Sequence, residues 1–224
     1  MSEVSLMKKN TPMENLRLTL GSISVVIFLL CLAIAITIWS IPMFLFSVNL
    51  FNLDQVVNIS KESILENYII LLQYLHFPWI DQLSMPDFPT SASGALHFSD
   101  VKNLFYLLYA LLLASGIFSF FFLNNLRKKE KLYKLKNIFR VLVFVPLIII
   151  VLLYFFFDEI FLLFHLTFFD NDAWMYDPRT DPIILVLPQE FFLMCFIEVF
   201  VLLELGLVAM YGLGKHNYNK LLVK

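Results

Sequence analysis

The chain has 224 residues, of which 60% are apolar and 15% are charged, whereas an ordinary soluble domain is about 45 to 50% apolar and about 25% charged. This composition excludes a water-soluble globule and a disordered chain, and the 6 Gly and 9 Pro exclude a collagen-like fibre. The net charge of −2 gives no basic excess, so we expect no nucleic-acid partner. We predict one all-α integral membrane domain over residues 1–224.

Four apolar runs are long enough to cross a bilayer, because about 20 helical residues span roughly 30 Å of hydrocarbon. We predict transmembrane helices over residues 21–46, 104–123, 141–157 and 191–213. The fourth run contains Glu198 and Glu204, and a carboxyl group inside a bilayer indicates either a function or a polar partner. For Glu204 we expect Ser115 or Ser119 of the second span to be that partner.

The first apolar run also has features of a signal peptide. Basic residues precede it, and it contains Ala33-x-Ala35, which is similar to a cleavage site. The run continues through Phe46, beyond the usual length of a signal peptide's apolar region, so we expect a retained first span.

The charged residues are divided between the two sides of these spans. Thirteen of the sixteen Lys and Arg residues lie in the N-terminal arm, the loop 124–140 and the C-terminal tail. Residues 47–103 and 158–190 hold thirteen of the eighteen acidic residues. The positive-inside rule therefore predicts that both termini and the basic loop are cytoplasmic, and that the other two segments form an extracellular cap.

Both outer segments have sequences typical of structured regions. In the first, Ser60 is the predicted N-cap of an amphipathic helix too short to span the bilayer. Its apolar face comprises Ile64, Leu65, Tyr68, Ile69, Leu72 and Leu75, and its polar face comprises Lys61, Glu62, Glu66, Asn67 and Gln73. The second segment interleaves aromatic residues with aspartates, which an interfacial aromatic belt explains only in part.

Two of the four histidines are candidates for chemistry. His97 lies just before Ser99-Asp100, the predicted N-cap and first residue of the second span, and His165 follows the third span. Both are expected at one depth, beside acidic and aromatic residues, which favours acid–base chemistry. An alternative is a metal site formed by His97 and Asp100 with His165 and Asp170 or Asp172. His76 and His216 are interpreted as incidental.

The sequence offers no obvious covalent nucleophile. It contains no GxSxG motif, and neither Cys31 nor Cys195 has a neighbouring base. Histidine acid–base catalysis without an acyl-enzyme is therefore the simplest enzymatic interpretation. The second and fourth helices both begin at the outer face, where their positive dipole ends and Lys102 would stabilise an oxyanion.

Two motifs carry a resemblance to a known family. They are Phe164-His165-x-x-Phe168-Phe169, followed by Trp174, Asp177-Pro178, Asp181 and Pro188, and, upstream, His97-x-x-Asp100-Val101-Lys102. In these motifs the chain resembles the lipoprotein intramolecular transacylases of Gram-positive bacteria. The resemblance implies a multi-pass enzyme of the cell membrane with its active site at the outer face. It would move the sn-2 acyl chain of a diacylglyceryl-cysteine to the free N-terminal amine, giving a lyso-form lipoprotein.

The resemblance also implies roles for individual residues. The family's two catalytic histidines correspond to His97 and His165; we assign His165 as the base and His97 as the residue that serves the ester oxygen. The implied substrate-binding residues are Asp100, Lys102, Phe168, Phe169, Trp174 and Asp177. The expected partners are a diacylated lipoprotein and membrane lipid, with no cofactor and no metal, and we expect a monomer.

Two other functions fit the same residues. A haem-binding electron carrier would use His97 and His165 as axial ligands within a four-helix bundle. A non-catalytic lipid-binding scaffold would need neither histidine for chemistry.

Overall fold

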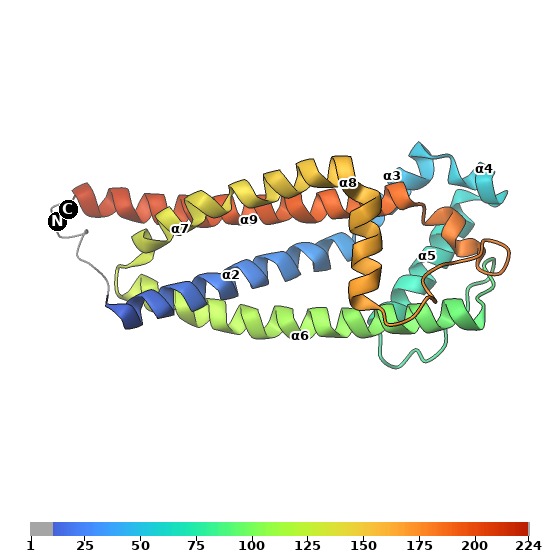
Figure 1. Cartoon of the computed structure of the whole chain (residues 1–224), viewed down its shortest axis with the longest axis horizontal. Coiled ribbons are helices and arrows are strands. Elements are labelled where there is room, and N and C mark those ends of the chain that lie inside the picture. Colours follow the sequence, from blue (N-terminus) through green and yellow to red (C-terminus); the bar gives the residue numbers. More distant parts are fainter. Residues whose placement is uncertain (1–10, 224) are drawn as a thin grey trace. The chain divides into compact units, whose positions relative to one another are not determined.

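The structure, a computed structural model, describes residues 11–223 and has helices and no strand in that range. Lys8, Lys9 and Lys224, which contribute to the predicted charge distribution, lie outside the described residues. Within this range, four helical segments are long and apolar enough to cross a membrane: α2 (Pro12–Ile38), α6 (Ala92–Lys128), Leu132–Phe168 and α9 (Gln189–Val223). The third of these segments comprises η1 (Leu132–Lys134), α7 (Leu135–Leu142) and α8 (Phe144–Phe168). The shorter elements are α3 (Ile41–Leu50), α4 (Leu53–Val57), α5 (Lys61–His76) and η2 (Pro182–Val186), and Figure 1 shows the arrangement of the helices. The predicted helical class and the four membrane-length helices are confirmed.

The contacts between residues divide the chain into two compact units. The described residues of the first unit are 11–36, 109–152 and 197–223, and those of the second unit are 37–108 and 153–196. The first unit has a core of aliphatic and aromatic side chains from α2, α6, η1, α7 and α9, formed by Leu18, Val25, Leu126, Leu132, Leu135, Phe139, Leu203 and Leu207. This core buries one apolar side of each of these helices.

The expected pairing of Glu204 with a serine of the second span is wrong. In the first unit the hydroxyl groups of Ser119 and Ser24 lie 3.2 Å apart, and the Ser115 hydroxyl donates to the carbonyl oxygen of Leu111 at 2.6 Å. A serine in a helix can satisfy its hydroxyl on the preceding turn, so it needs no acidic partner. Within residues 11–223, Oε2 of Glu204 is buried without a hydrogen-bond partner.

The second unit has a more aromatic core. Phe44 of α3 stacks on Tyr68 of α5 with ring centroids 3.7 Å apart, and Phe191 of α9 meets both rings edge-on. Ile183 and Val186 of η2 are fully buried in the same cluster. These contacts hold α3, α5, η2 and the start of α9 together, and Phe98 of α6, the neighbour of His97, belongs to the same cluster.

The first predicted span divides into two helices, so its end at Phe46 is wrong. α2 begins earlier than predicted because Thr11 and Glu14 cap each other: each side chain accepts a hydrogen bond from the other's backbone N–H at 3.2 Å. α2 ends at Ile38, and Pro42 lies in the first turn of α3. Proline has no N–H to donate and fits the first turn of a new helix better than the interior of a continuing one.

The second membrane-length helix begins at Ala92, which makes the predicted N-cap at Ser99 wrong. Ser91 performs this function: its hydroxyl accepts a hydrogen bond from the N–H of Gly94 at 3.0 Å. The prediction failed because hydropathy follows apolar content, whereas helix termini are fixed by hydrogen bonds. As a consequence, His97 lies inside α6.

The third membrane-length helix continues past its predicted end at Phe157. α8 runs to Phe168 with one non-helical residue, Phe156, at φ −132° and ψ 31°. In the second unit, the part of α8 after this kink runs across to α6 (Figure 1). The acidic residues after Phe157 end the apolar run but not the helix, so His165 lies in the last turn of α8.

The short predicted helix from Ser60 is confirmed. α5 runs from Lys61 to His76, and the Ser60 hydroxyl accepts a hydrogen bond from the N–H of Ser63 at 3.1 Å. Asn67, predicted on the polar face, is fully buried instead. Its amide donates to a carboxylate oxygen of Asp87 at 2.7 Å, and its carbonyl oxygen accepts from the Asp87 N–H at 3.1 Å. A buried polar side chain needs such partners, and this one ties α5 to the loop before α6.

His76 is a buried packing residue of α5. Its Nδ1–H donates to the carbonyl oxygen of Leu72 at 2.6 Å, and its ring centroid lies 4.0 Å from that of Trp39. Burial lowers the pKa of His76 below the ordinary value for histidine.

Candidate active site

The second unit brings His97 and His165 together. Their ring centroids are 6.0 Å apart, and each residue is only 7% exposed. His97 comes from the second turn of α6, and His165 from the last turn of α8. Two imidazoles from helices far apart in the sequence therefore lie close enough to act on one small headgroup.

The hydrogen bond made by His165 fixes its tautomer. Nδ1 lies 2.7 Å from the carbonyl oxygen of Phe161, and a carbonyl oxygen can only accept, so Nδ1 carries the hydrogen. A neutral ring then has its lone pair on Nε2. The ring lies between Phe161, at 4.3 Å between centroids, and Trp174, at 4.6 Å. His165 is thus oriented with one nitrogen able to accept a proton.

His97 is surrounded by aromatic rings. Its centroid lies 4.6 Å from that of Phe169 and 5.5 Å from that of Tyr176. Its Nδ1 is buried, and so is Nε1 of Trp174, and neither atom has a hydrogen-bond partner in the part of the chain that the structure describes. Buried polar atoms without partners are rare, and each one in a folded protein needs an explanation.

The segment between α8 and η2 is fastened to the start of α6 by Asp181. This residue is 2% exposed, and its carboxylate accepts hydrogen bonds from the Ser91 N–H at 2.8 Å and from the Thr180 hydroxyl at 2.7 Å. Gly94 lies so close that a Cβ atom there would overlap the Asp181 carboxylate. The Tyr176 hydroxyl donates weakly to the Gly94 carbonyl oxygen at 3.4 Å.

These contacts hold Tyr176 against His97. Burial and the nearby charge of Asp181 raise the pKa of the Tyr176 hydroxyl, so it stays protonated and serves as a donor.

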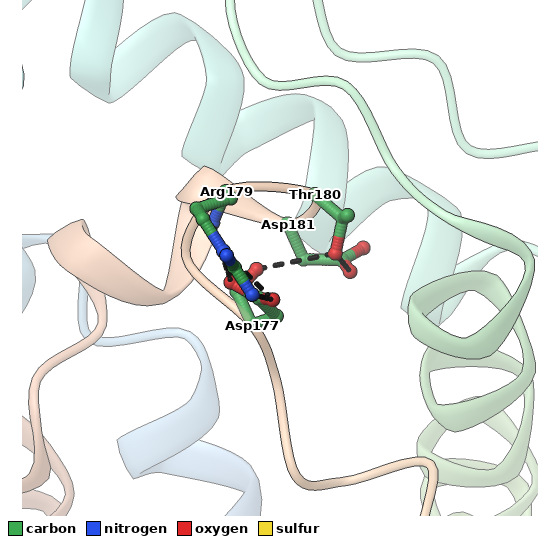
Figure 2. A network of polar contacts seen from close by, with 4 residues as sticks. All are labelled: Asp177, Arg179, Thr180 and Asp181. Carbon is green, nitrogen blue, oxygen red and sulfur yellow. Dashed lines mark hydrogen bonds and ion pairs between the residues drawn. The ribbon is translucent and has the colours of Figure 1, made fainter.

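Asp177, a predicted substrate-binding residue, lies at the exposed turn beside this fastening (Figure 2). Its carboxylate accepts hydrogen bonds from Arg179, the shortest at 2.6 Å, and also from the Arg179 backbone N–H at 2.9 Å. These bonds lower the pKa of Asp177 to about 2. The structure therefore gives Asp177 a local partner and does not bring it into contact with either imidazole.

Asp100 and Lys102, the other predicted polar residues, also have protein partners. Asp100 accepts a hydrogen bond from Nδ2 of Asn171 at 3.0 Å, and the Asn171 side-chain oxygen in turn accepts from the Ala173 N–H at 2.9 Å. The ammonium group of Lys102 donates to the carbonyl oxygen of Ile80 at 2.6 Å. Asp100 thus positions the chain that leads to Trp174, and Lys102 supports the turn that follows α5.

The aromatic residues of the second motif have different surroundings. Phe169 is buried beside both imidazoles, with its centroid 4.6 Å from His97 and 5.6 Å from His165. Phe168 is 51% exposed and packs on Phe164 at 4.9 Å. Of the two phenylalanines, only Phe169 contacts the imidazoles.

Sequence reasoning did not assign roles to Asn171, Tyr176, Asp181 and Gly94. The local sequence Asp177-Pro178-Arg179 indicates a turn, but the bonds from Asp181 to Ser91 and from Asn171 to Asp100 join residues far apart in the chain. No local pattern reveals such pairs. The alternative metal set does not assemble either: among the described residues, no three His, Cys, Asp or Glu side chains lie together as a metal site requires.

A protein-family model described as "Lipoprotein intramolecular transacylase Lit" matches residues 19–192 of the chain. The chain belongs to the Lit family. The match includes both histidines and every residue predicted for the site. The family match gives no support to the two alternative functions, a haem-binding electron carrier and a non-catalytic lipid-binding scaffold. None of the curated proteins compared matches the chain.

Solved structures of Lit from Bacillus cereus have the same fold. One is 27% identical to the chain, with a TM-score of 0.88, and the alignment covers 95% of this chain and 99% of that one. A variant of the Bacillus cereus protein with a histidine replaced by arginine has a TM-score of 0.81, covering 93% of each chain, and a histidine-to-alanine variant has 0.82, covering 95% and 96%. Both variants are also 27% identical to the chain. The Bacillus cereus protein is described as membrane-integral, in agreement with the four membrane-length helices here.

Proposed function

We propose that this Lit-family chain moves the sn-2 acyl chain of a diacylglyceryl-cysteine to the cysteine's own amine, using His97 and His165 as its acid–base pair. The observation that carries the proposal is the 6.0 Å separation of the two buried imidazoles in a chain of this family. The product is a lyso-form lipoprotein with an N-acyl group and a free glyceryl hydroxyl.

The proposed reaction requires proton transfers from the amine and to the departing oxygen, and two histidines can carry them out. The substrate amine resembles a peptide α-amino group, with an ordinary pKa of about 7.7 to 8.0, so it arrives largely as an ammonium ion. One proton passes to His97, which makes the amine nucleophilic, and the nitrogen then attacks the ester carbonyl carbon. Nε2 of His165 accepts a second proton from that nitrogen as the amide forms. His97 returns its proton to the departing sn-2 oxygen, and His165 releases the other to solvent.

The tautomer of His165 supports the assignment of this residue as the base, because Nδ1–H is engaged by the carbonyl oxygen of Phe161 and Nε2 retains its lone pair. Attack closes an eight-atom ring through the cysteine, the sulfur and the glyceryl carbons. The enzyme's main task is therefore to fold the substrate on itself, and proximity supplies much of the acceleration. No acyl-enzyme is required.

The aromatic rings around the imidazoles support an intramolecular transfer over hydrolysis. Phe169, Trp174 and Tyr176 enclose the two histidines, and such a lining keeps water from the ester. We infer that Asp100 acts by positioning, through Asn171, the segment that carries Trp174.

The location of the site is part of the same proposal. The division of Lys and Arg residues favours cytoplasmic termini and a histidine pair at the outer face, beneath a cap formed by residues 47–103 and 158–190. Diacylated lipoproteins are anchored in that leaflet, with membrane lipid around them. The enzyme is expected to work as a monomer, because both histidines and their aromatic neighbours come from one chain.

The reaction is tested on the N-terminal peptide of a lipoprotein from cells that express or lack the protein. Acyl migration conserves mass, so fragmentation by mass spectrometry must locate the acyl chain. We expect it on nitrogen in cells with the protein and on the sn-2 oxygen in cells without it. An unchanged acyl position would contradict the proposed activity.

The acid–base pair is tested with His97→Asn and His165→Asn. Asparagine retains polarity and lacks a titratable nitrogen, so we expect each variant to lose transacylation by at least about 10³-fold while melting near the parent temperature. His76→Asn is the matched control, since His76 is equally buried but lies against Trp39 and not in the site. Full activity in either site variant would rule out the two-histidine mechanism.

A further inference from the structure

The proposed transfer needs a hydrogen-bond donor that the two histidines do not supply. When nitrogen attacks the ester, negative charge develops on the carbonyl oxygen, and enzymes stabilise such an oxyanion with fixed donors. His165 is occupied with the attacking nitrogen, and its Nδ1–H is already bonded to Phe161. His97 is occupied with the departing oxygen. A separate donor must therefore serve the carbonyl oxygen, provided that the proposed function holds.

The polar side chains expected nearby are committed elsewhere. Lys102 donates to the carbonyl oxygen of Ile80, and Nδ2 of Asn171 donates to Asp100. At the start of α6, the N–H of Ser91 donates to Asp181 and the N–H of Gly94 to the Ser91 hydroxyl. These donors stabilise the protein itself.

Two of the aromatic rings that contact the imidazoles carry a donor, Tyr176 and Trp174. The Tyr176 hydroxyl points to the Gly94 carbonyl oxygen at 3.4 Å. In contrast, Nε1–H of Trp174 is buried and has no hydrogen-bond partner among residues 11–223. An indole N–H can only donate, and leaving it buried without an acceptor is unfavourable. A tryptophan held in this way is poised to donate to a bound oxygen atom.

The position of Trp174 suits this task. Its ring lies 4.6 Å from that of His165 between centroids, with 31° between the planes, so the indole lies alongside the imidazole that accepts the second proton of the attacking nitrogen. Asn171 fixes the turn immediately before it. Because Nε1 is shielded from solvent, a hydrogen bond from it would act in a low-dielectric environment, where such bonds stabilise charge most strongly.

We propose that Trp174 is a catalytic residue whose indole N–H donates a hydrogen bond to the carbonyl oxygen of the migrating acyl group. As the N–C bond forms, the electron pair of the C=O bond moves to this oxygen, and the bond from Nε1–H strengthens. The pair returns when the bond between the acyl carbon and the sn-2 oxygen breaks, and the glyceryl oxygen leaves with the proton from His97. Trp174 neither gains nor loses a proton in this step.

The test replaces only the N–H group of the Trp174 indole. Incorporation of 3-benzothienylalanine at position 174 exchanges N–H for sulfur and keeps the bicyclic shape and the packing on His165. We expect kcat to fall about 10²- to 10³-fold, as for loss of one oxyanion donor, with KM nearly unchanged. The melting temperature should be unchanged or higher, because the replaced donor had no partner in the protein. Trp174→Phe should lower kcat similarly, which provides a second, genetically simpler variant.

The controls separate this proposal from the proposed function. Trp79→Phe is the matched substitution: Trp79 is 73% exposed and stacks only on Phe77 among the described aromatic residues, so full activity is expected. Full kcat with benzothienylalanine, while His97→Asn and His165→Asn are inactive, would overturn the role of Trp174 and leave the proposed function intact. A 10²-fold loss in Tyr176→Phe together with full kcat in the benzothienylalanine protein would assign the donor to Tyr176 and also overturn the proposal.

Discussion

Hydrogen bonds to backbone carbonyl oxygens determine which nitrogen atoms or N–H groups of His165 and Lys102 remain available to a substrate. The carbonyl oxygen of Phe161 accepts the hydrogen bond from Nδ1–H of His165 and leaves Nε2 as a base, whereas the carbonyl oxygen of Ile80 accepts a hydrogen bond from the Lys102 ammonium group. The residue types predicted a base and a cation for this region. Which nitrogen stays available depends on acceptors in the folded backbone, and no motif specifies those acceptors.

Because the ammonium group of Lys102 is buried and has partners in the protein, we expect substitution of this residue to lower the stability of the fold. Lys102 is 9% exposed, donates to the Ile80 carbonyl oxygen at 2.6 Å and lies over the Tyr74 ring at 4.3 Å. Lys102→Met keeps the length of the side chain and removes both interactions, so we expect the free energy of unfolding to fall by about 2 to 3 kcal/mol. Thermal unfolding in detergent measures this fall.

Lys61→Met is the matched control for that experiment. The Lys61 side chain is 41% exposed and lies 4.0 Å from Asp54, and an exposed pair of this kind contributes at most about 1 kcal/mol. Equal melting temperatures for the two variants would contradict a structural role for Lys102 and would leave its ammonium group available to a substrate phosphate or oxyanion.

At the scale of elements, the chain's helices were predictable and their ends were not. The apolar run from Leu104 predicted the second membrane-length helix, yet α6 begins at Ala92, because Ser91 caps it and Asp181 receives the Ser91 N–H. Hydropathy measures the solvent around a helix, whereas a cap depends on hydrogen bonds. The local cap of α5 was predicted from Ser60, but the cap of α6 also involves a residue 90 positions away.

Because Asp181 holds the start of α6, we expect a methyl group added at Gly94 to affect catalysis. A Cβ atom in Gly94→Ala would overlap the Asp181 carboxylate, so the segment carrying Tyr176 and the turn of α6 that carries His97 must shift apart. A displacement of about 1 Å in a catalytic group can cost about 100-fold in rate, so we expect kcat to fall by about 10- to 100-fold. The assay is the single-turnover rate of the folded protein.

Gly212→Ala provides the control for Gly94→Ala in another helix. Nothing lies within 4 Å of a Cβ atom at Gly212, which is exposed on α9. Alanine is favoured over glycine in a helix by about 0.5 to 1 kcal/mol, so this variant should melt slightly higher with full activity. If Gly94→Ala were as active as Gly212→Ala, the contact between Asp181 and α6 would have no part in positioning His97.

For the architecture of the complete chain, the apolar content and the length of the apolar runs were the informative features. The apolar content and the four long runs predicted a helical membrane protein, and the structure has four helices of that kind in residues 11–223. The meeting of His97 and His165 was expected only as a shared depth, since hydropathy places residues along the membrane normal and not around it. Their contact depends on the kink at Phe156 and on the segment that leads to η2, which no pattern in the sequence specifies.

The proposed orientation of the chain in the membrane predicts which positions an external reagent can reach. With Cys31 and Cys195 replaced by alanine, single cysteines are introduced by Arg179→Cys, in the exposed turn beside Asp181, and by Lys129→Cys, in the exposed basic loop. The positive-inside rule places Arg179 outside and Lys129 in the cytoplasm. A membrane-impermeant maleimide should therefore label position 179 in intact cells, and position 129 only after the membrane is permeabilised. Labelling of position 129 in intact cells, with protection of 179, would invert the chain and move the histidine pair away from the leaflet in which diacylated lipoproteins are anchored.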